Sequence, residues 1–176
     1  MEIIRGLVSK FRELFEGDLA AYPEGKISHW NRRFHYLLRK TQCSGNRLSK
    51  AWHHFGFRIV SMQHRMEISY KARIGRGLCL SDPFTVTINS NAVLGERVTL
   101  GKNVTIGKQN RGERVGSPVI GDRVVIGDNA VIVGNIRIGS SVRIAPGAYI
   151  NRDIPDNSYA AGNPGTVQEQ AQIEEG

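Results

Sequence analysis

From residue 68 onward, an aliphatic residue returns at every sixth position. Three runs keep this spacing and together hold thirteen such residues: Ile68, Ile74 and Leu80; Ile88, Leu94, Leu100 and Ile106; and Ile120, Ile126, Ile132, Ile138, Ile144 and Ile150. A period of six fits neither an α-helix, with about 3.6 residues per turn, nor a flat sheet that buries every second residue. It predicts a solenoid in which each six-residue unit forms one short strand and one turn, with the aliphatic side chains stacked inside.

Two stretches interrupt this period. The first covers residues 81–87, and the second, longer one covers residues 108–119 and is rich in polar residues and glycine. Insertions in a solenoid leave the core as loops, which often form the binding face, so we expect the second stretch to protrude. Within the repeats a glycine often follows the aliphatic residue, as at Gly75, Gly101 and Gly121. We expect it to supply turn conformations that bulkier residues resist.

The chain before residue 66 has a different pattern, with apolar residues at helical spacing. It predicts three helices, over residues 3–16, 30–38 and 48–66. The fold class is therefore mainly β, a parallel β-helix preceded by a short α-helical segment. We place a basic helical segment at residues 1–66, the β-helix at 67–167 and a disordered C-terminal tail at 168–176.

Positive charge is concentrated in the helical segment. The formal net charge is +8, and nine basic residues but no acidic one lie between Glu24 and Glu67, together with the aromatic residues Trp30, Phe34, Trp52 and Phe55. Such a stretch fits contact with an anionic membrane surface, or helices whose aromatic side chains pack on the solenoid while Lys and Arg face water. Phosphate contacts would also suit nucleic acid, but no nucleic-acid-binding motif is present, so we predict no nucleic-acid partner.

The composition also bears on location and on metal chemistry. No run of about 18 apolar residues and no signal-peptide core occurs, so we expect a soluble, cytoplasmic protein. Cys43 and Cys79 lack metal-ligand spacing, so neither a disulfide framework nor a metal site is expected. All histidines precede the repeats: His29, His35, His53, His54 and His64.

Three short sequences within the repeat region add a resemblance to a known family. They are Arg111-Gly112-Glu113-Arg114, Ser117-Pro118-Val119-Ile120-Gly121-Asp122 and the ending Ala161-Gly162-Asn163-Pro164. With them, the chain from residue 66 to 167 resembles the serine acetyltransferase branch of the left-handed β-helix acyltransferases, which includes enzymes that O-acetylate polysaccharides. The resemblance implies a left-handed β-helix, a homotrimer, and acetyl-CoA as co-substrate in the groove between subunits.

In that family a histidine takes the proton of the acceptor hydroxyl, which then attacks the thioester. In register, Asp82 stands at the position of this histidine, and Lys102 at the position of a second one that some members have. We name both as candidate catalytic residues. The alternatives are a turn aspartate that bonds its own backbone and a solvated turn lysine. His64, the histidine nearest the first repeat in sequence, is a further candidate.

The resemblance also suggests residues that bind acetyl-CoA. Arg111 and Arg114 lie in the long insertion, and guanidinium groups suit phosphates through paired hydrogen bonds, although a solvated loop or a salt bridge within the trimer is the alternative. Ser117 and Ala145 fall in register with groove positions. Thr166 stands where relatives carry Lys or Arg, so one contact to the charged end of CoA is missing.

We therefore predict an acetyl-CoA-dependent O-acetyltransferase that acts on a sugar hydroxyl or serine without a metal. The alternative is a catalytically inactive trimeric homologue that serves as a scaffold or regulator, because Asp82 replaces the family histidine. A metal-dependent hydratase of the same architecture would need histidines on the coils, and the coils contain none.

Overall fold

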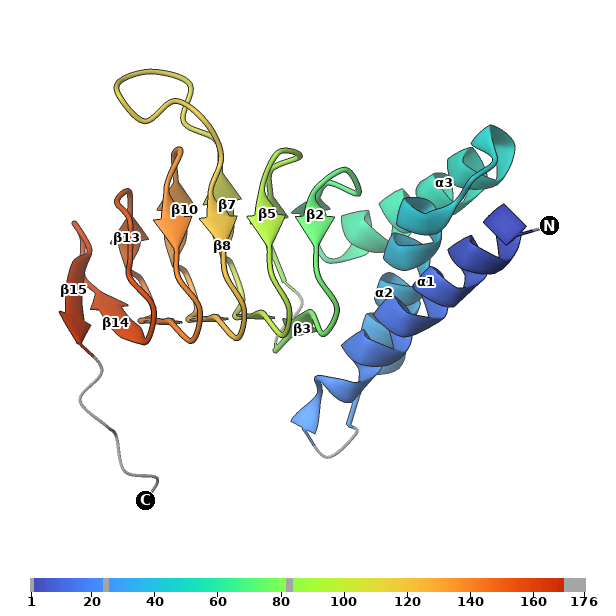
Figure 1. Cartoon of the computed structure of the whole chain (residues 1–176), viewed down its shortest axis with the longest axis horizontal. Helices are drawn as coiled ribbons and strands as arrows, with labels where there is room; N and C mark the ends of the chain where they lie inside the picture. The colour runs from blue at the N-terminus through green and yellow to red at the C-terminus, as the bar shows by residue number, and fades with distance from the viewer. Residues whose placement is uncertain (1, 24–25, 82–83, 170–176) are drawn as a thin grey trace.

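A computed structural model describes residues 2–23, 26–81 and 84–169 of the chain (Figure 1). It begins with three helices, α1 (Glu2–Ala20), α2 (His29–Cys43) and α3 (Arg47–Gln63). Two of them start at a capping side chain. Ser28 accepts a hydrogen bond from the Asn31 N–H at 3.1 Å, and Asn46 accepts one from the Leu48 N–H at 2.9 Å. The three predicted helices are therefore present.

Short strands of two to four residues follow the helices. They are β1 (Glu67–Ile68), β2 (Arg73–Ile74), β3 (Cys79–Leu80), β4 (Thr87–Ile88), β5 (Val93–Leu94), β6 (Thr99–Leu100), β7 (Thr105–Gly107), β8 (Val119–Ile120), β9 (Val125–Ile126), β10 (Val131–Val133), β11 (Arg137–Ile138), β12 (Arg143–Ile144), β13 (Tyr149–Ile150), β14 (Ser158–Ala161) and β15 (Thr166–Glu169). Each of the thirteen aliphatic positions lies in one of these strands.

The strands form three sheets, in the orders β1-β4-β7-β10-β13, β11-β8-β5-β2 and β15-β14-β12-β9-β6-β3. Successive coils pair in parallel, as Thr87 does with Thr105 and Ile88 with Ile106. An uninterrupted coil thus takes 18 residues, or three six-residue units, and passes once through each sheet. The coils stack side by side along one axis, with the helices at the end where the first coil lies (Figure 1). The predicted parallel β-helix is confirmed.

The interior of the solenoid is filled by the predicted aliphatic side chains, all thirteen of which are buried. The residue two positions before each of them is also directed inward, as Ala92, Val104 and Val142 show. Two residues per unit therefore share the core, and the outward residue between them lies on the prism surface, where Val119 and Val125 are 43% and 40% exposed. Burying each aliphatic side chain contributes roughly 1.5–3 kcal/mol of gross stabilisation.

The glycines of the repeats have a different cause from the predicted one. Gly75, Gly101 and Gly121 do not have a positive φ; the left-handed residues include Arg97, Asn103 and Arg123 instead. The glycines are required because adjacent coils approach closely. A Cβ on Gly75 would lie 2.5 Å from the carbonyl oxygen of Gly95, and a Cβ on Gly121 would lie 2.8 Å from the carbonyl of Gly139.

The C-terminal end of the solenoid is covered by a strand that turns back. β14 continues the sheet beside β12, and β15 pairs antiparallel with β14, placing Thr166 opposite Ala161. Because this pairing reaches Glu169, the predicted disordered tail is wrong for residues 168 and 169, which belong to β15. Its remaining residues, 170–176, lie outside the described residues.

The four aromatic residues of the basic stretch divide into two pairs. Phe34 is fully buried in the core shared with the first coil, and Trp30 stacks on it with ring centroids 5.3 Å apart. Trp52 and Phe55 of α3 are 77% and 64% exposed. The interpretation that the aromatics pack the helices onto the solenoid therefore holds for the first pair and is wrong for the second.

We predict that Gly121→Ala lowers the free energy of unfolding by about 1–3 kcal/mol, because the added methyl group meets the backbone of Gly139. The measurement is urea unfolding followed by circular dichroism. Gly6→Ala is the control, since a Cβ on Gly6 in α1 meets nothing within 4 Å and gains helix propensity. If Gly121→Ala were as stable as the unaltered protein, close stacking would not be the reason for this glycine.

Candidate active site

One column of turns follows the strands of the six-stranded sheet, and Lys102 lies in it, after β6. Its backbone N–H donates to Asp128 Oδ1 in the next coil at 3.0 Å, and its Nζ lies 3.7 Å from Asp128 Oδ2. Beside it, Asn103 Nδ2 donates to Asn129 Oδ1 at 2.9 Å. Lys102 therefore helps to stack one coil on the next, and its side chain is still 52% exposed.

Asp82 follows β3 in the sequence as Lys102 follows β6, but it lies outside the described residues. Of its neighbours, Ser81 donates its hydroxyl to the Leu100 carbonyl at 2.9 Å, and the Phe84 carbonyl accepts from the Asn103 N–H at 2.9 Å. Ala145 lies in the turn after β12, where its N–H donates to the Ala160 carbonyl at 2.8 Å. This column of turns thus contains Lys102 and Ala145 at one corner of the prism.

The long insertion lies at another corner, between β7 and β8, and it protrudes from the prism (Figure 1). Gln109 and Gly116 close it as an antiparallel pair, with N–H to carbonyl distances of 2.9 and 3.0 Å. Ser117 at its base donates to Asn89 Oδ1 at 3.0 Å. The prediction that this stretch leaves the core is confirmed.

The two arginines of the insertion differ in how they are held. Arg111 is exposed, and its carbonyl accepts from Gln109 Nε2 at 2.7 Å. Arg114 Nη1 lies 3.5 Å from Asp153 Oδ1, and its carbonyl accepts from the Asn135 N–H at 2.9 Å. A hollow of about 600 Å3 lies between Arg114 and the turn that contains Asp153. Within a single chain, the candidate residues therefore form two groups at two corners.

His64 is the histidine whose ring lies beside the first turn of the Lys102 column. It follows the end of α3, and its ring centroid is 4.9 Å from that of Phe84 and 3.9 Å from that of Trp30.

His53 bonds within α3 to the Ser49 carbonyl at 2.7 Å. His54 packs on Tyr70, and burial, with help from Arg58 and Lys50, lowers its pKa.

A histidine and a carboxylate do meet in this chain, in a buried cluster that the sequence pattern did not predict. Asp18 of α1 accepts hydrogen bonds from Arg39 Nε and Nη2, both at 2.8 Å, and from His35 Nδ1 at 3.1 Å. Tyr22 lies 2.9 Å from His35 Nε2 through its hydroxyl. The Tyr22 oxygen also accepts from the Leu80 N–H at 3.2 Å, so this hydroxyl links His35 to the first coil.

The same cluster binds the backbone of the first coil. Asp18 Oδ1 accepts from the N–H groups of Gly77 and Leu78, both at 3.0 Å. Arg39 donates to the carbonyls of Ile74 at 2.8 Å and Gly75 at 2.6 Å. Asp18, His35 and Arg39 are fully buried, so no substrate reaches them, and their role is to seat the helices on the solenoid.

The electrostatics of the cluster follow from burial and hydrogen bonding. Burial alone raises the pKa of Asp18, but the hydrogen bonds and charges of Arg39 and His35 outweigh it and hold this pKa below the ordinary value. Burial raises the pKa of Tyr22 well above its usual range. A visible sign in the sequence was the spacing of His35 and Arg39, four residues apart on the apolar side of a helix.

The described residues, 2–23, 26–81 and 84–169, contain neither a cluster of metal ligands nor a membrane-spanning helix. In that part of the chain no three His, Cys, Asp or Glu side chains are grouped so as to hold a metal ion. None of its helices has the length and apolar character needed to cross a bilayer.

The repeats of this chain are similar to those of known acyltransferases. A family model for the bacterial transferase hexapeptide (six repeats) matches residues 117–152. Serine acetyltransferase 4 of Arabidopsis thaliana is 37% identical over 115 residues, which cover 63% of this chain and 32% of that protein. The chain thus spans about a third of the length of this curated relative.

Solved structures extend the likeness to the helices. Serine acetyltransferase of Neisseria gonorrhoeae in complex with serine is 27% identical, with a TM-score of 0.76 over 94% of this chain and 73% of that chain. The soybean serine acetyltransferase apoenzyme is 25% identical, with a TM-score of 0.76 over 95% and 74%. The chain is thus similar to serine acetyltransferases in its fold, and its repeats match the hexapeptide-repeat transferase model. Its β-helix is accordingly left-handed, as the resemblance implied.

We predict that Asp18→Asn costs about 3–5 kcal/mol of unfolding free energy at pH 7, because the buried Arg39 loses its counter-charge. Urea unfolding measures it. Asp153→Asn is the control. Asp153 and Arg114 form an exposed pair, and such pairs contribute at most about 1 kcal/mol. Equal losses in the two variants would contradict the role of the buried pair.

The lowered pKa of Asp18 also predicts a dependence on pH. The pKa of an aspartate in the unfolded chain is about 3.9, and the pKa of Asp18 in the folded chain is lower. At a pH between these two pKa values, the unfolded state therefore binds more protons than the folded state. The stability from Asp18 is therefore complete above the unfolded pKa and is lost as the pH falls through the folded one. Unfolding free energies measured from pH 6 to pH 3 should fall more steeply for the unaltered protein than for Asp18→Asn.

Proposed function

We propose that this chain is an acetyl-CoA-dependent O-acetyltransferase whose acceptor is a sugar hydroxyl or serine. The observation that carries the proposal is the likeness, over 94% of the chain, to a serine acetyltransferase solved with serine. In this reaction the acceptor oxygen bonds to the acetyl carbon, the bond from that carbon to the CoA sulfur breaks, and a base takes the proton of the acceptor.

We infer a homotrimer as the active form, because one chain does not bring the candidate residues together. Lys102 and Ala145 lie at the corner after the six-stranded sheet, whereas Arg111, Arg114 and Ser117 lie at the corner between β7 and β8. In a closed ring of three subunits, each contact joins two different surfaces of the chain. Such a contact places the corner with the insertion beside the other corner of the neighbouring subunit, forming one groove.

In this groove Asp82 is the proposed base, and Lys102 is the proposed second polar group. A carboxylate with an ordinary pKa of about 4 is a weak base near neutrality, so Asp82 requires desolvation, which a neighbouring subunit supplies when it covers the turn. His64 packs against Phe84 beside that turn and is the candidate that would replace Asp82 as base. Backbone N–H groups would stabilise the negative charge on the thioester oxygen.

Acetyl-CoA is proposed to bind through its phosphates to Arg111 and Arg114 and along Ser117 and Ala145. The guanidinium of Arg114 has five N–H donors, and its contact with Asp153 involves one of its nitrogens. The Arg114 side chain is 44% exposed, so its other donors can bond a phosphate. Arg111 is exposed in the same loop. The chain supplies the phosphate contacts and the orientation, and the thioester supplies the acyl group.

The second candidate is a trimeric scaffold or regulator without catalysis. It is favoured by one observation, that the coils contain no histidine. The two candidates differ in ligand binding, since an acetyltransferase must bind acetyl-CoA and a scaffold need not.

The test is transfer of radiolabelled acetyl from acetyl-CoA to serine and to a panel of sugars. We expect transfer to at least one acceptor, and a loss of about a hundredfold or more in Asp82→Asn, because general-base catalysis contributes about 10²–10⁴-fold. Asp122→Asn is the control, since Asp122 accepts the Glu96 N–H at 2.8 Å in a turn at the third corner. Full activity of Asp82→Asn would exclude Asp82 as base and direct the next substitution to His64.

Absence of transfer to every acceptor, together with absence of acetyl-CoA binding by titration calorimetry, would favour the scaffold. If acetyl-CoA bound without transfer, Asp82→His would test whether restoring the family residue restores activity. We expect that variant to gain activity only if the groove and the acceptor site are otherwise intact.

We further propose a cytoplasmic location, with peripheral contact between α3 and an anionic membrane surface. Apolar side chains spaced three or four residues apart form a stripe on α3 that is between 44% and 81% exposed: Leu48, Trp52, Phe55, Ile59 and Met62. The helix carries Arg47, Lys50 and Arg58 and no acidic residue. An apolar stripe with cationic flanks fits the interface of an anionic bilayer, whereas two copies of the same helix would repel each other.

We expect the protein to float with phosphatidylglycerol vesicles and not with phosphatidylcholine vesicles. The double variant Trp52→Ser with Phe55→Ser should bind phosphatidylglycerol vesicles about tenfold or more weakly. Val125→Ser, which removes an exposed apolar side chain from the β-helix, should leave flotation unchanged. Absence of the unaltered protein from the floating fraction with both kinds of vesicle would rule out the proposed membrane contact.

A further inference from the structure

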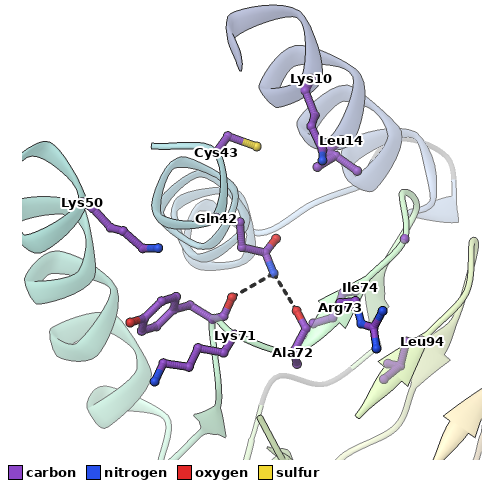
Figure 2. Close-up of a pocket in the computed structure, with 12 residues that line it drawn as sticks. Lys10, Leu14, Gln42, Cys43, Lys50, Lys71, Ala72, Arg73, Ile74 and Leu94 are labelled. Atoms are coloured by element: carbon purple, nitrogen blue, oxygen red, sulfur yellow. Dashed lines mark hydrogen bonds between the residues drawn. The ribbon is translucent and has the colours of Figure 1, made fainter. Parts of the chain in front are cut away.

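A pocket of about 530 Å3 lies where the helices meet the first coil (Figure 2). Lys10 enters it from α1 and Lys50 from α3, on opposite sides of Gln42 and Cys43 of α2. Lys71 and Arg73 border it from the first coil, in and after the turn that follows β1. The pocket shares no residue with the proposed acetyl-CoA groove.

The charges around the pocket are unbalanced. Four cations from three separate segments line it, and no acidic side chain is among its described lining residues. Within the described chain, Arg39, Arg76, Lys102 and Arg114 each pair with a carboxylate, whereas none of the four pocket cations forms an ion pair. Gathering like charges around one space is unfavourable unless an anion neutralises them.

The floor of the pocket is fixed and largely neutral. Gln42 Nε2 donates to the carbonyls of Tyr70 and Ala72 at 3.4 and 3.1 Å, and Gln42 Oε1 accepts from Arg39 at 3.0 Å, so this side chain holds the floor (Figure 2). Burial raises the pKa of the Cys43 thiol, which therefore adds no negative charge. Leu14 and Leu94 supply apolar surface beside the cations.

We propose that this pocket binds a compound with a diphosphate group and an organic portion that lies on the apolar floor. A diphosphate carries several negative charges on adjacent phosphates, which matches cations converging from three directions, and Arg73 can bond a phosphate through two parallel N–H groups. The volume is within the range of about 300–1,000 Å3 that small-molecule sites have. The ligand links α1 and α3 to the first coil, so its binding stabilises the helices on the solenoid.

The test is titration calorimetry at low ionic strength with inorganic pyrophosphate, orthophosphate and ADP, accompanied by thermal unfolding. We expect pyrophosphate and ADP to bind saturably and more tightly than orthophosphate, and to raise the melting temperature. Replacing Lys10 and Lys50 together by Gln should weaken pyrophosphate binding by about tenfold or more. The double variant Lys71→Gln with Arg73→Gln should lose the same affinity for pyrophosphate. It replaces the first double variant if that protein folds poorly.

Two control pairs remove the same net charge elsewhere. Arg47→Gln with Arg58→Gln alters exposed cations of α3 that do not line the pocket, and Arg111→Gln with Arg114→Gln alters the proposed acetyl-CoA groove. Both should bind pyrophosphate within about twofold of the unaltered protein. Equal weakening in all pairs, loss confined to the groove pair, or absence of binding at about 10 mM pyrophosphate overturns the proposal. None of these measurements follows acetyl transfer. Absence of pyrophosphate binding would therefore leave the proposed acetyltransferase reaction untouched, and absence of acetyl transfer would leave the proposed diphosphate pocket untouched.

Discussion

The buried ion pair between Asp18 and Arg39 is the interaction on which the arrangement of this chain depends. The first coil of a solenoid has no preceding coil, so its backbone groups on that side lack the partners that later coils have. Asp18 accepts the N–H groups of Gly77 and Leu78, and Arg39 donates to the carbonyls of Ile74 and Gly75. The helices therefore act as the cap of the solenoid, and the cap works through polar side chains as well as through an apolar face.

Close stacking of the coils governs the remainder of the prism. Glycines such as Gly101 and Gly121 allow the backbones of adjacent coils to meet, while the left-handed turn residues that follow these two glycines are Asn103 and Arg123. Asn103 bonds to Asn129, and Asp128 accepts from Lys102, so turn side chains pair from one coil to the next. A site on such a surface is built from turns in register, which is why a change at one turn alters its neighbours along the column.

The six-residue period was sufficient to predict the solenoid, its core and the protruding insertion, because each depends on the position of an aliphatic residue relative to its own neighbours. The cap was not predictable in this way. Asp18, His35 and Arg39 meet only when α1, α2 and the first coil are brought together, and no local pattern encodes that contact. The glycines were located correctly and explained wrongly, since the required space is set by a different coil. The candidate groove shares this limit, because its two groups of residues lie at different corners of the chain.

The cations of the helical segment divide according to whether folding uses them. Arg39 is fully buried, is neutralised by Asp18 and holds the first coil, so its charge is explained by the fold. Among the described residues, Lys10 and Lys50 make no comparable contact, and the Lys50 Nζ lies 5.2 Å from the centroid of the Tyr70 ring. Within the described chain neither lysine pairs with a carboxylate or holds the first coil, as Arg39 does. A concentration of charge that stability does not need, at the junction where a ligand would touch three segments at once, is best explained by binding.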